Sequence, residues 1–428
     1  MRHNKATLLC ALAALTAACA DEGVSPDNGS KLAHRQESPA TSARATRGKA
    51  EAIARLFAPY RATDEAGGNK AAEAVPEVSS VSFYVSDGDT LLYAFNYGEG
   101  EGYTIVSGST ASFPIMAQSG DGRVDFDTAN EGDPFTFFAG LMARSVKERL
   151  DRTTTADTAY AALWQHVDDP DYTYEVAPLD EDKEAVGNKG RLTKTGREYI
   201  HPHTGLELKN WGQYGDYNSA APNRACIGCP AVAIGMLLYD VCTRTFGKTE
   251  ETKPSFSVED RLAYNAKHVS TKLREIANTI PNYNWGKSKE KESGASATNI
   301  LTGLRRLGFT SAKLSPYNFE TAYSSLSFPA TSYFGTQITA NRGILLLGFK
   351  GNNGHIWFCD GYRETAYRVT RTKRRLFRKT RTTWTEYEDT LYMNWGWGDN
   401  SNGWYHAGEI GFNNFLHMIT GLDKYTKP

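Results

Sequence analysis

The pattern of apolar and polar positions divides the chain into a strand-rich first part and a mixed second part. Three runs between residues 76 and 125 have the length and alternation of β-strands: Val81–Val85, Thr90–Tyr97 and Tyr103–Val106. The Asp87-Gly88 pair separates the first two runs, and a turn of this type predicts a β-hairpin. A helical stretch follows from Pro134 to Leu150. We therefore expect a small α+β unit over residues 76–150.

In the second part, helical patterns come before strand patterns. The segment Ala231–Tyr239 is apolar on every face, as a buried helix would be. The helices expected here are Cys229–Cys242, Val258–Val269 and Ser296–Leu307. The strands expected after them are Gly343–Gly348, Ile356–Cys359, Thr390–Met393 and Gly403–Tyr405. Helices followed by a sheet are the order of an α+β fold, so we expect one such domain over residues 195–428.

The stretch between these two parts changes character. It is first acidic, with Asp168, Asp169 and Asp171, and then basic, with Lys189 and Arg191. We interpret residues 151–194 as a linker whose second half is exposed. Exposed linkers are natural places for proteolytic nicking.

The first residues have the features of an export signal. Arg2 and Lys5 form a basic head, and the apolar segment Thr7–Ala18 is too short to span a bilayer as a helix. The segment Leu15–Cys19 resembles a bacterial lipoprotein cleavage site, after which Cys19 would carry lipid; the alternative is an ordinary signal peptide cut near Ala18 or Ala20. We expect a signal peptide of the lipoprotein type over residues 1–19, a flexible tether over 20–75, and export to the cell envelope or beyond.

Composition adds few constraints. The chain has 428 residues and a formal net charge of −1, so it shows no signature of nucleic-acid binding. Two of the six cysteines fall in the signal region, and the remaining four are too few for a disulfide scaffold. Cys242 and Cys359 have apolar neighbours, which favours a place in the core.

The triplet Gly228-Cys229-Pro230 is the strongest chemical signal in the chain. Proline is favoured at the first position of a helix, so Cys229 is expected at a helix N-terminus. The helix dipole there favours a charged sulfur, and a thiol is a useful nucleophile only as the thiolate. Downstream, His355 begins one strand-like stretch and Asn394 ends the next. Adjacent strands would bring imidazole and amide side by side and hold the ring in the required tautomer.

Four segments together resemble the streptopain-type cysteine peptidases, which are secreted bacterial enzymes with a papain-like, two-lobed fold. They are Trp211–Asn218, Gly228–Ala233, Gly354–Tyr362 and Asn394–Gly398. The resemblance implies Cys229 as nucleophile, His355 as general base and Gln213 as oxyanion donor. It implies Asn394 or Trp395 as the group that orients the histidine. No metal or organic cofactor is implied.

The strand-rich unit resembles the propeptide of streptopain-like zymogens, through Leu92–Asn96 and Gly102–Gly108. We therefore expect residues 76–150 to be an intramolecular inhibitor, with an activation cleavage in the 151–194 linker. The expected partners are protein or peptide substrates and this propeptide, and no nucleic acid.

Two other interpretations remain open on the sequence alone. Cys226 and Cys229 form a C-x-x-C pair: with His201 and His203 they would make the four ligands of a zinc site, or the pair alone would be a redox dithiol. A zinc site would leave no role for Gln213. The other possibility is an inactive papain-like relative that binds peptides.

A basic insertion lies between the candidate histidine and asparagine. It has eight basic residues: Arg368, Arg371, Lys373, Arg374, Arg375, Arg378, Lys379 and Arg381. We expect a long β-hairpin that protects a sheet edge; the functional alternatives are contact with an acidic substrate or an anionic surface, or a nicking site.

Overall fold

The computed structural model describes most of the chain between Ala43 and Leu422, in segments. These are residues 43–60, 76–127, 134–152, 160–178, 208–245, 266–286, 293–318, 322, 343–350, 353–376, 378–398, 401–406 and 416–422. All of them belong to one unit, Thr41–Pro428. Within these segments, no helix has both the length and the apolar content that crossing a bilayer requires.

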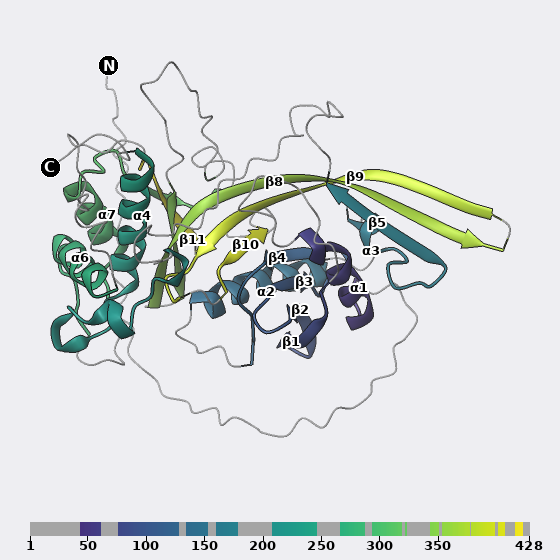
Figure 1. The fold of residues 1–428 in the computed structure, drawn as a ribbon, viewed down its shortest axis with the longest axis horizontal. Coiled ribbons are helices and arrows are strands. Elements are labelled where there is room, and N and C mark those ends of the chain that lie inside the picture. The colour runs from purple at the N-terminus through teal and green to yellow at the C-terminus, as the bar shows by residue number, and fades with distance from the viewer. Residues whose placement is uncertain are drawn as a thin grey trace, which may run out of the picture. The chain divides into compact units, whose positions relative to one another are not determined.

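The described strands form one antiparallel sheet (Figure 1). They are β1 Val78–Ser86, β2 Asp89–Tyr97, β3 Tyr103–Ser107, β4 Ile115–Ser119, β5 Tyr172–Pro178, β6 Lys313–Pro316, β7 Ile344–Lys350, β8 Asn353–Arg375, β9 Arg378–Asn394, β10 Gly403–His406 and β11 Leu416–Thr420. Their order across the sheet is β1-β2-β3-β4-β10-β9-β8-β7-β11-β6, and β5 pairs with β8. The basic insertion makes β8 and β9 the longest strands.

The helices fall in both parts of the chain. They are α1 Arg47–Phe57, α2 Pro134–Arg152, α3 Ala161–Trp164, α4 Cys229–Thr245, α6 Ala266–Thr279 and α7 Ala297–Arg306. Short 3-10 turns occupy Ala58–Tyr60, Leu208–Asn210, Gly215–Asn218 and Pro222–Arg224. Two starts are capped by hydroxyls: Thr46 accepts a hydrogen bond from the Lys49 amide, and Ser296 accepts one from the Asn299 amide.

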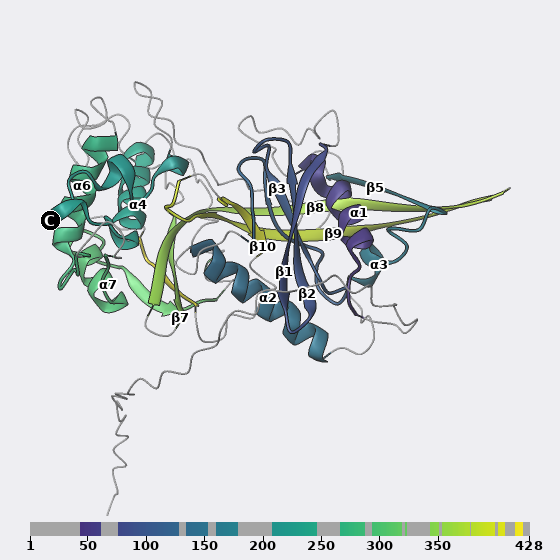
Figure 2. The ribbon, with the colours of Figure 1, turned by 90° about the horizontal axis from the view of Figure 1, so that it is seen from below.

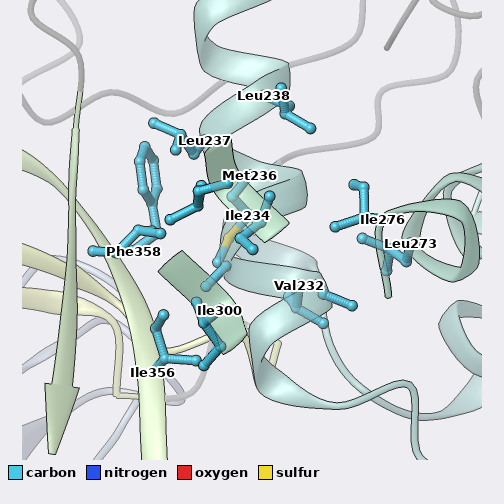
Figure 3. Packing of buried hydrophobic residues seen from close by; sticks show 14 of the residues in the cluster. Val232, Ile234, Met236, Leu237, Leu238, Leu273, Ile276, Ile300, Ile356 and Phe358 are labelled. Atoms are coloured by element: carbon cyan, nitrogen blue, oxygen red, sulfur yellow. The ribbon is translucent and has the colours of Figure 1, made fainter. Parts of the chain in front are cut away.

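The two faces of β7 and β8 are covered by different helices. Ile356 and Phe358 pack into a cluster with α4, as Figure 3 shows for Val232 and Met236. The intervening Trp357 belongs to a second cluster with α2. Because side chains alternate between the faces of a strand, α4 and α2 lie on opposite faces of the sheet.

The first part of the chain and the second share this sheet through a short joint. In the antiparallel pairing of β4 with β10, Gln118 faces Trp404 and Ala117 faces Tyr405. Beside the joint, the hydroxyls of Tyr103 and Tyr405 are 2.9 Å apart. The strand-rich unit is therefore a continuation of the sheet that carries the candidate histidine. Figure 2 shows β1–β3 and α2 from below.

The predicted α+β class is confirmed, with helices α4, α6 and α7 preceding the strands of the second part. Helix α4 begins at Cys229, as the Gly-Cys-Pro signal predicts. The expected helix Val258–Val269 lies mostly outside the described residues, and α6 begins at Ala266.

Two regions differ from the predictions. Helix α1 lies within 20–75, the range expected as a flexible tether, and buries Ile53 and Phe57 against the strands β2 and β3. The range expected as a linker, 151–194, contains α3 and the strand β5. In both cases apolar side chains find a buried surface elsewhere in the chain, which local composition does not reveal.

Candidate functional site

Cys229 is the first residue of α4, and the loop before it is tightly constrained. Gly228 has φ of +89°, and a Cβ there would overlap the Tyr283 hydroxyl, so both backbone and space require glycine. The same hydroxyl donates a hydrogen bond of 2.7 Å to the Ile227 carbonyl. The Cys229 side chain is partly exposed. The thiol therefore lies at a helix N-terminus on a fixed loop, which favours the thiolate.

Gln213 is fastened to this loop. Its backbone carbonyl accepts a hydrogen bond of 3.1 Å from the Ile227 amide, and its side-chain Oε1 accepts one of 3.2 Å from the Cys226 thiol. The residue is 4% exposed, and its Nε2 has no hydrogen-bond partner among the described residues. A buried amide with unused N–H groups, held beside the nucleophile's loop, has the chemistry of an oxyanion donor.

His355 faces away from the α4 side of the sheet. Its ring stacks on Trp357 at 6.0 Å, with the planes 9° apart. Its Nε2–H donates a hydrogen bond of 3.0 Å to the Trp395 carbonyl. Burial lowers the pKa of His355 to about 3, although the Trp395 carbonyl opposes that change. The imidazole is therefore neutral here.

The thiol and the imidazole consequently lie on different faces of the sheet. Cys229 packs against the cluster that contains Ile356 and Phe358, whereas His355 stacks on Trp357. In this arrangement the imidazole is engaged by the Trp395 carbonyl and by Trp357, on the face of the sheet opposite to Ile356 and Phe358.

Asn394 does not meet His355 either, which corrects the expectation from adjacent strands. It pairs across the ladder with Phe358, so its side chain lies on the α4 face. Its Nδ2 donates a 3.3 Å hydrogen bond to the Leu208 carbonyl, and its Oδ1 accepts one of 3.2 Å from the Gly396 amide. In this register of β8 and β9, the asparagine and the histidine project from opposite faces of the sheet.

Trp395 contacts the histidine through its backbone. Its carbonyl is the acceptor for His355 Nε2, and its indole N–H donates a 2.8 Å hydrogen bond to the Ser401 carbonyl. The ring is 1% exposed and packs at 5.0 Å from Trp357. Trp395 thus joins the histidine to a buried aromatic cluster.

Helix α2 of the first part supplies the rest of that cluster. Phe138 lies 5.9 Å from Trp357 and 5.1 Å from Trp395, measured between ring centroids. Phe137 occupies the space where a Cβ of Gly348 would be, and Gly348 is the ladder partner of His355. Residues opposite each other in a ladder project from the same face, so the aromatic residues of α2 cover the face that carries the imidazole.

Some residues of this site escape a search by motif. Asn402 accepts a 2.9 Å hydrogen bond from the Trp395 amide and donates one of 3.0 Å to the Lys209 carbonyl, which ties the tryptophan to the segment before Gln213. Tyr283 contributes the hydroxyl that donates to the Ile227 carbonyl, and Gly348, by having no side chain, leaves room for Phe137. None of the three has a sequence neighbour that marks it, although all lie near motif residues in the folded chain.

The metal alternative finds no cluster in the segments that the structure describes. No group of three or more His, Cys, Asp or Glu side chains lies close enough to hold an ion there. His201 and His203, the other proposed ligands, lie outside the described residues. Cys226 instead contacts Gln213.

Comparisons with known proteins match both parts of the chain. Residues 42–146 match the description Spi protease inhibitor, and residues 211–405 match the description Peptidase C10 family. The second range includes every candidate site residue. Among solved structures, a fragment of prointerpain A from Prevotella intermedia is similar at 16% identity and a TM-score of 0.47, covering 82% of this chain and 99% of that one. No curated protein gives a significant match.

Proposed function

Because the chain belongs to the peptidase C10 family, the streptopain family, and carries a Spi-type inhibitor domain before its peptidase part, we propose that it is a latent endopeptidase of proteins with Cys229 as nucleophile. It is the zymogen of a cysteine peptidase. The observation that carries the site assignment is the buried Gln213 amide, fastened to the loop that presents the thiol.

In the proposed reaction, the Cys229 thiolate attacks the carbonyl carbon of a peptide bond. The oxyanion of the tetrahedral intermediate accepts hydrogen bonds from Gln213 Nε2 and from the Cys229 backbone amide. His355, which has taken the thiol proton as the thiolate formed, gives that proton to the leaving amine as the C–N bond breaks, which leaves an acyl-enzyme thioester. The same imidazole then takes a proton from water as water attacks the thioester.

Latency follows from where His355 lies in the uncut chain. Phe137 and Phe138 of α2 cover its face of the sheet, and its ring is stacked there on Trp357. A base held on the opposite face from Cys229 cannot take part in the reaction. Cleavage between about residues 180 and 197 would detach the inhibitor domain and allow the imidazole to move to the thiol and to Asn394.

Export is part of the proposal and rests on sequence alone. The basic head, the short apolar segment and Cys19 favour a lipoprotein signal. A protein that carries lipid on Cys19 would incorporate labelled palmitate in a bacterial host. A Cys19→Ser variant that still incorporated the label would contradict this part of the proposal.

The activity is tested with purified protein and casein, with and without a thiol alkylator. Casein hydrolysis should stop on alkylation, and mass spectrometry should find the label on Cys229. Hydrolysis that continues when Cys229 is fully labelled would reject it as the nucleophile. Binding of casein without any hydrolysis would favour the inactive relative.

A further inference from the structure

The basic hairpin is covered along one edge by a strand from the other side of the expected cleavage region. Strand β5 pairs with β8 over its whole length, from Tyr172 opposite Lys373 to Pro178 opposite Tyr367 (Figure 1). The hairpin therefore binds an extended segment in the uncut chain, and is more than the solvated edge protection expected from the sequence.

One face of this pairing is aromatic and cationic. The Lys373 ammonium lies 4.9 Å from the centre of the Tyr172 ring. The Arg371 guanidinium lies 6.0 Å from the same ring and 5.7 Å from the ring of Trp384 on β9. Distances of this size allow cation–π attraction. Tyr174 adds an edge contact to Trp384 at 6.4 Å.

The other face pairs opposite charges. Glu175 lies 3.7 Å from Arg381 of β9 and projects from the opposite side of β5 to the two tyrosines. Asp168, Asp169 and Asp171 precede the strand, so the bound segment is acidic and the hairpin basic. The hairpin thus takes aromatic side chains on one face and acidic side chains on the other, with the backbone supplying strand pairing.

The apolar base of the hairpin is buried by the same first part of the chain. Tyr367 and Val369 are 1% and 0% exposed, packed in a cluster with Val176 and Phe57. The proposed cleavage lies beyond Pro178, so β5 and α1 leave together with the inhibitor domain. The released enzyme then has an open strand edge at residues 367–373 beside Trp384.

We propose that this open edge of β8 is a substrate-docking site of the mature peptidase. It takes extended, acidic segments of protein substrates with aromatic residues at alternate positions, by strand addition, and β5 is its occupant in the zymogen. The inference rests on the proposed function, because the edge opens only after cleavage beyond β5. Strand addition supplies affinity through the backbone, and the alternating side chains supply specificity.

The probe is a fluorescein-labelled peptide with the sequence of residues 171–178. Mature enzyme, prepared by self-conversion, is alkylated at the active thiol so that the probe is not cut. N-terminal sequencing establishes that residues 172–178 are gone. We expect saturable binding that weakens as salt is raised, and loss of binding for a probe N-methylated on the alternate residues that face β8.

Paired variants separate the edge from general charge. R371A/K373A should bind the probe roughly tenfold more weakly, from two lost cation–π contacts. R378A/K379A removes the same charge from the hairpin tip, beyond the end of β5, and should bind within about twofold of wild type. Both should cleave a short peptide substrate as wild type does. That substrate extended by residues 171–178 should show a lowered KM in wild type and R378A/K379A but not in R371A/K373A.

Several results would overturn the docking site. They are equal binding of the probe by both double variants, equal binding of the N-methylated and unmethylated probes, a mature enzyme that retains β5, or a mature dimer that excludes the probe. Failure of self-conversion would contradict the proposed function and not the docking site. In that case a site-specific protease sequence inserted after Pro178 would release the same fragment, and probe binding could still be measured.

Discussion

At the scale of single residues, the Gln213 side-chain amide accepts a hydrogen bond through its oxygen, and its nitrogen donates none within the described residues. Its Oε1 accepts a hydrogen bond from Cys226, and its buried Nε2 has no partner in the described part of the chain. A donor that is already in place when charge develops contributes to the transition state more than to substrate binding.

The Gln213→Ala variant of the mature enzyme should therefore lose about 10²–10³-fold in kcat with little change in KM, the usual size for one oxyanion donor. Steady-state kinetics on a short peptide measure both constants. A change confined to KM would show that Gln213 contacts the substrate in its ground state.

The two neighbouring thiols should differ in effect. Cys229→Ala should abolish peptidase activity, because it removes the nucleophile at the start of α4. Cys226→Ala should leave most of it, since a thiol is a weak hydrogen-bond donor to Gln213. Activity on casein and the metal content of wild type are the measurements. Comparable losses in both variants, with bound zinc, would support the metal site instead.

Acid should weaken the packing around His355. The pKa of His355 is lowered to about 3 in the folded chain, against about 6.5 for an unperturbed histidine. The unfolded chain binds more protons between these values, so folding stability falls as pH drops from about 6.5 toward 3. Urea unfolding of the uncut Cys229→Ala chain at pH 7 and pH 5 measures this. A His355→Gln change in that background should reduce the pH dependence; an unchanged dependence would show that other groups cause it.

At this scale the sequence predicts the residue types of the site, but not the face on which His355 and Asn394 project. Cys229 at a helix start follows from Gly228 and Pro230, which are its immediate neighbours. What covers the face on which His355 projects is α2, which lies far earlier in the chain. No local pattern around His355 contains that information.

At the scale of elements, helix α2 is the piece that covers the imidazole's face of the sheet. Phe138 is fully buried, with Trp357, Trp395 and Tyr405 around it. Such a position tolerates truncation poorly, because the space it leaves is lined by rigid rings.

Phe138→Ala should cost about 3–5 kcal/mol of packing and shorten the lag before self-conversion. Gel analysis of conversion over time, together with the melting temperature of the uncut Cys229→Ala form, tests both effects. Glu148→Ala, on the exposed side of α2, is the matched control and should convert as wild type does. An unchanged lag in Phe138→Ala would mean that α2 does not hold the histidine.

The elements that could be predicted are those with strong local periodicity. Strands β1–β3 and helices α2, α4 and α7 are of this kind. Strands β4, β6 and β11 were not predicted, since they are short and gain their stability from partners distant in sequence, such as β10 for β4 and β7 for β11. Strand β5 lies in an acidic, polar stretch of the sequence, and it forms a strand by pairing with the basic edge of β8.

At the scale of the whole molecule, the inhibitor domain and the peptidase share one sheet, with β5 as a second attachment. Without its signal peptide, the Cys229→Ala chain should therefore keep a mass of about 45 kDa. Active protein should convert to a fragment of roughly 26 kDa, at about 110 Da per residue over residues 195–428. Gel electrophoresis with mass spectrometry follows this conversion.

The separate segment 76–150, added in trans, should inhibit the fragment. A segment over residues 43–178 should inhibit more strongly, because it includes α1 and β5. A full-length chain that is fully active without cleavage, combined with no inhibition by either segment, would make this region an accessory domain.

The joint between β4 and β10 also bears on how the protein acquires its fold. The hydroxyl of Tyr103 donates a 2.8 Å hydrogen bond to the Ser401 carbonyl, across 298 residues of chain. Pairings of such long range form slowly, and domains fold from the N-terminus during synthesis. Since β4 is synthesised long before β10, we expect the edge of β4 to be available as a template when β10 pairs with it. A peptidase released from that edge would then depend on its barrier to unfolding, because an unfolded chain would lack the strand on which β10 was assembled.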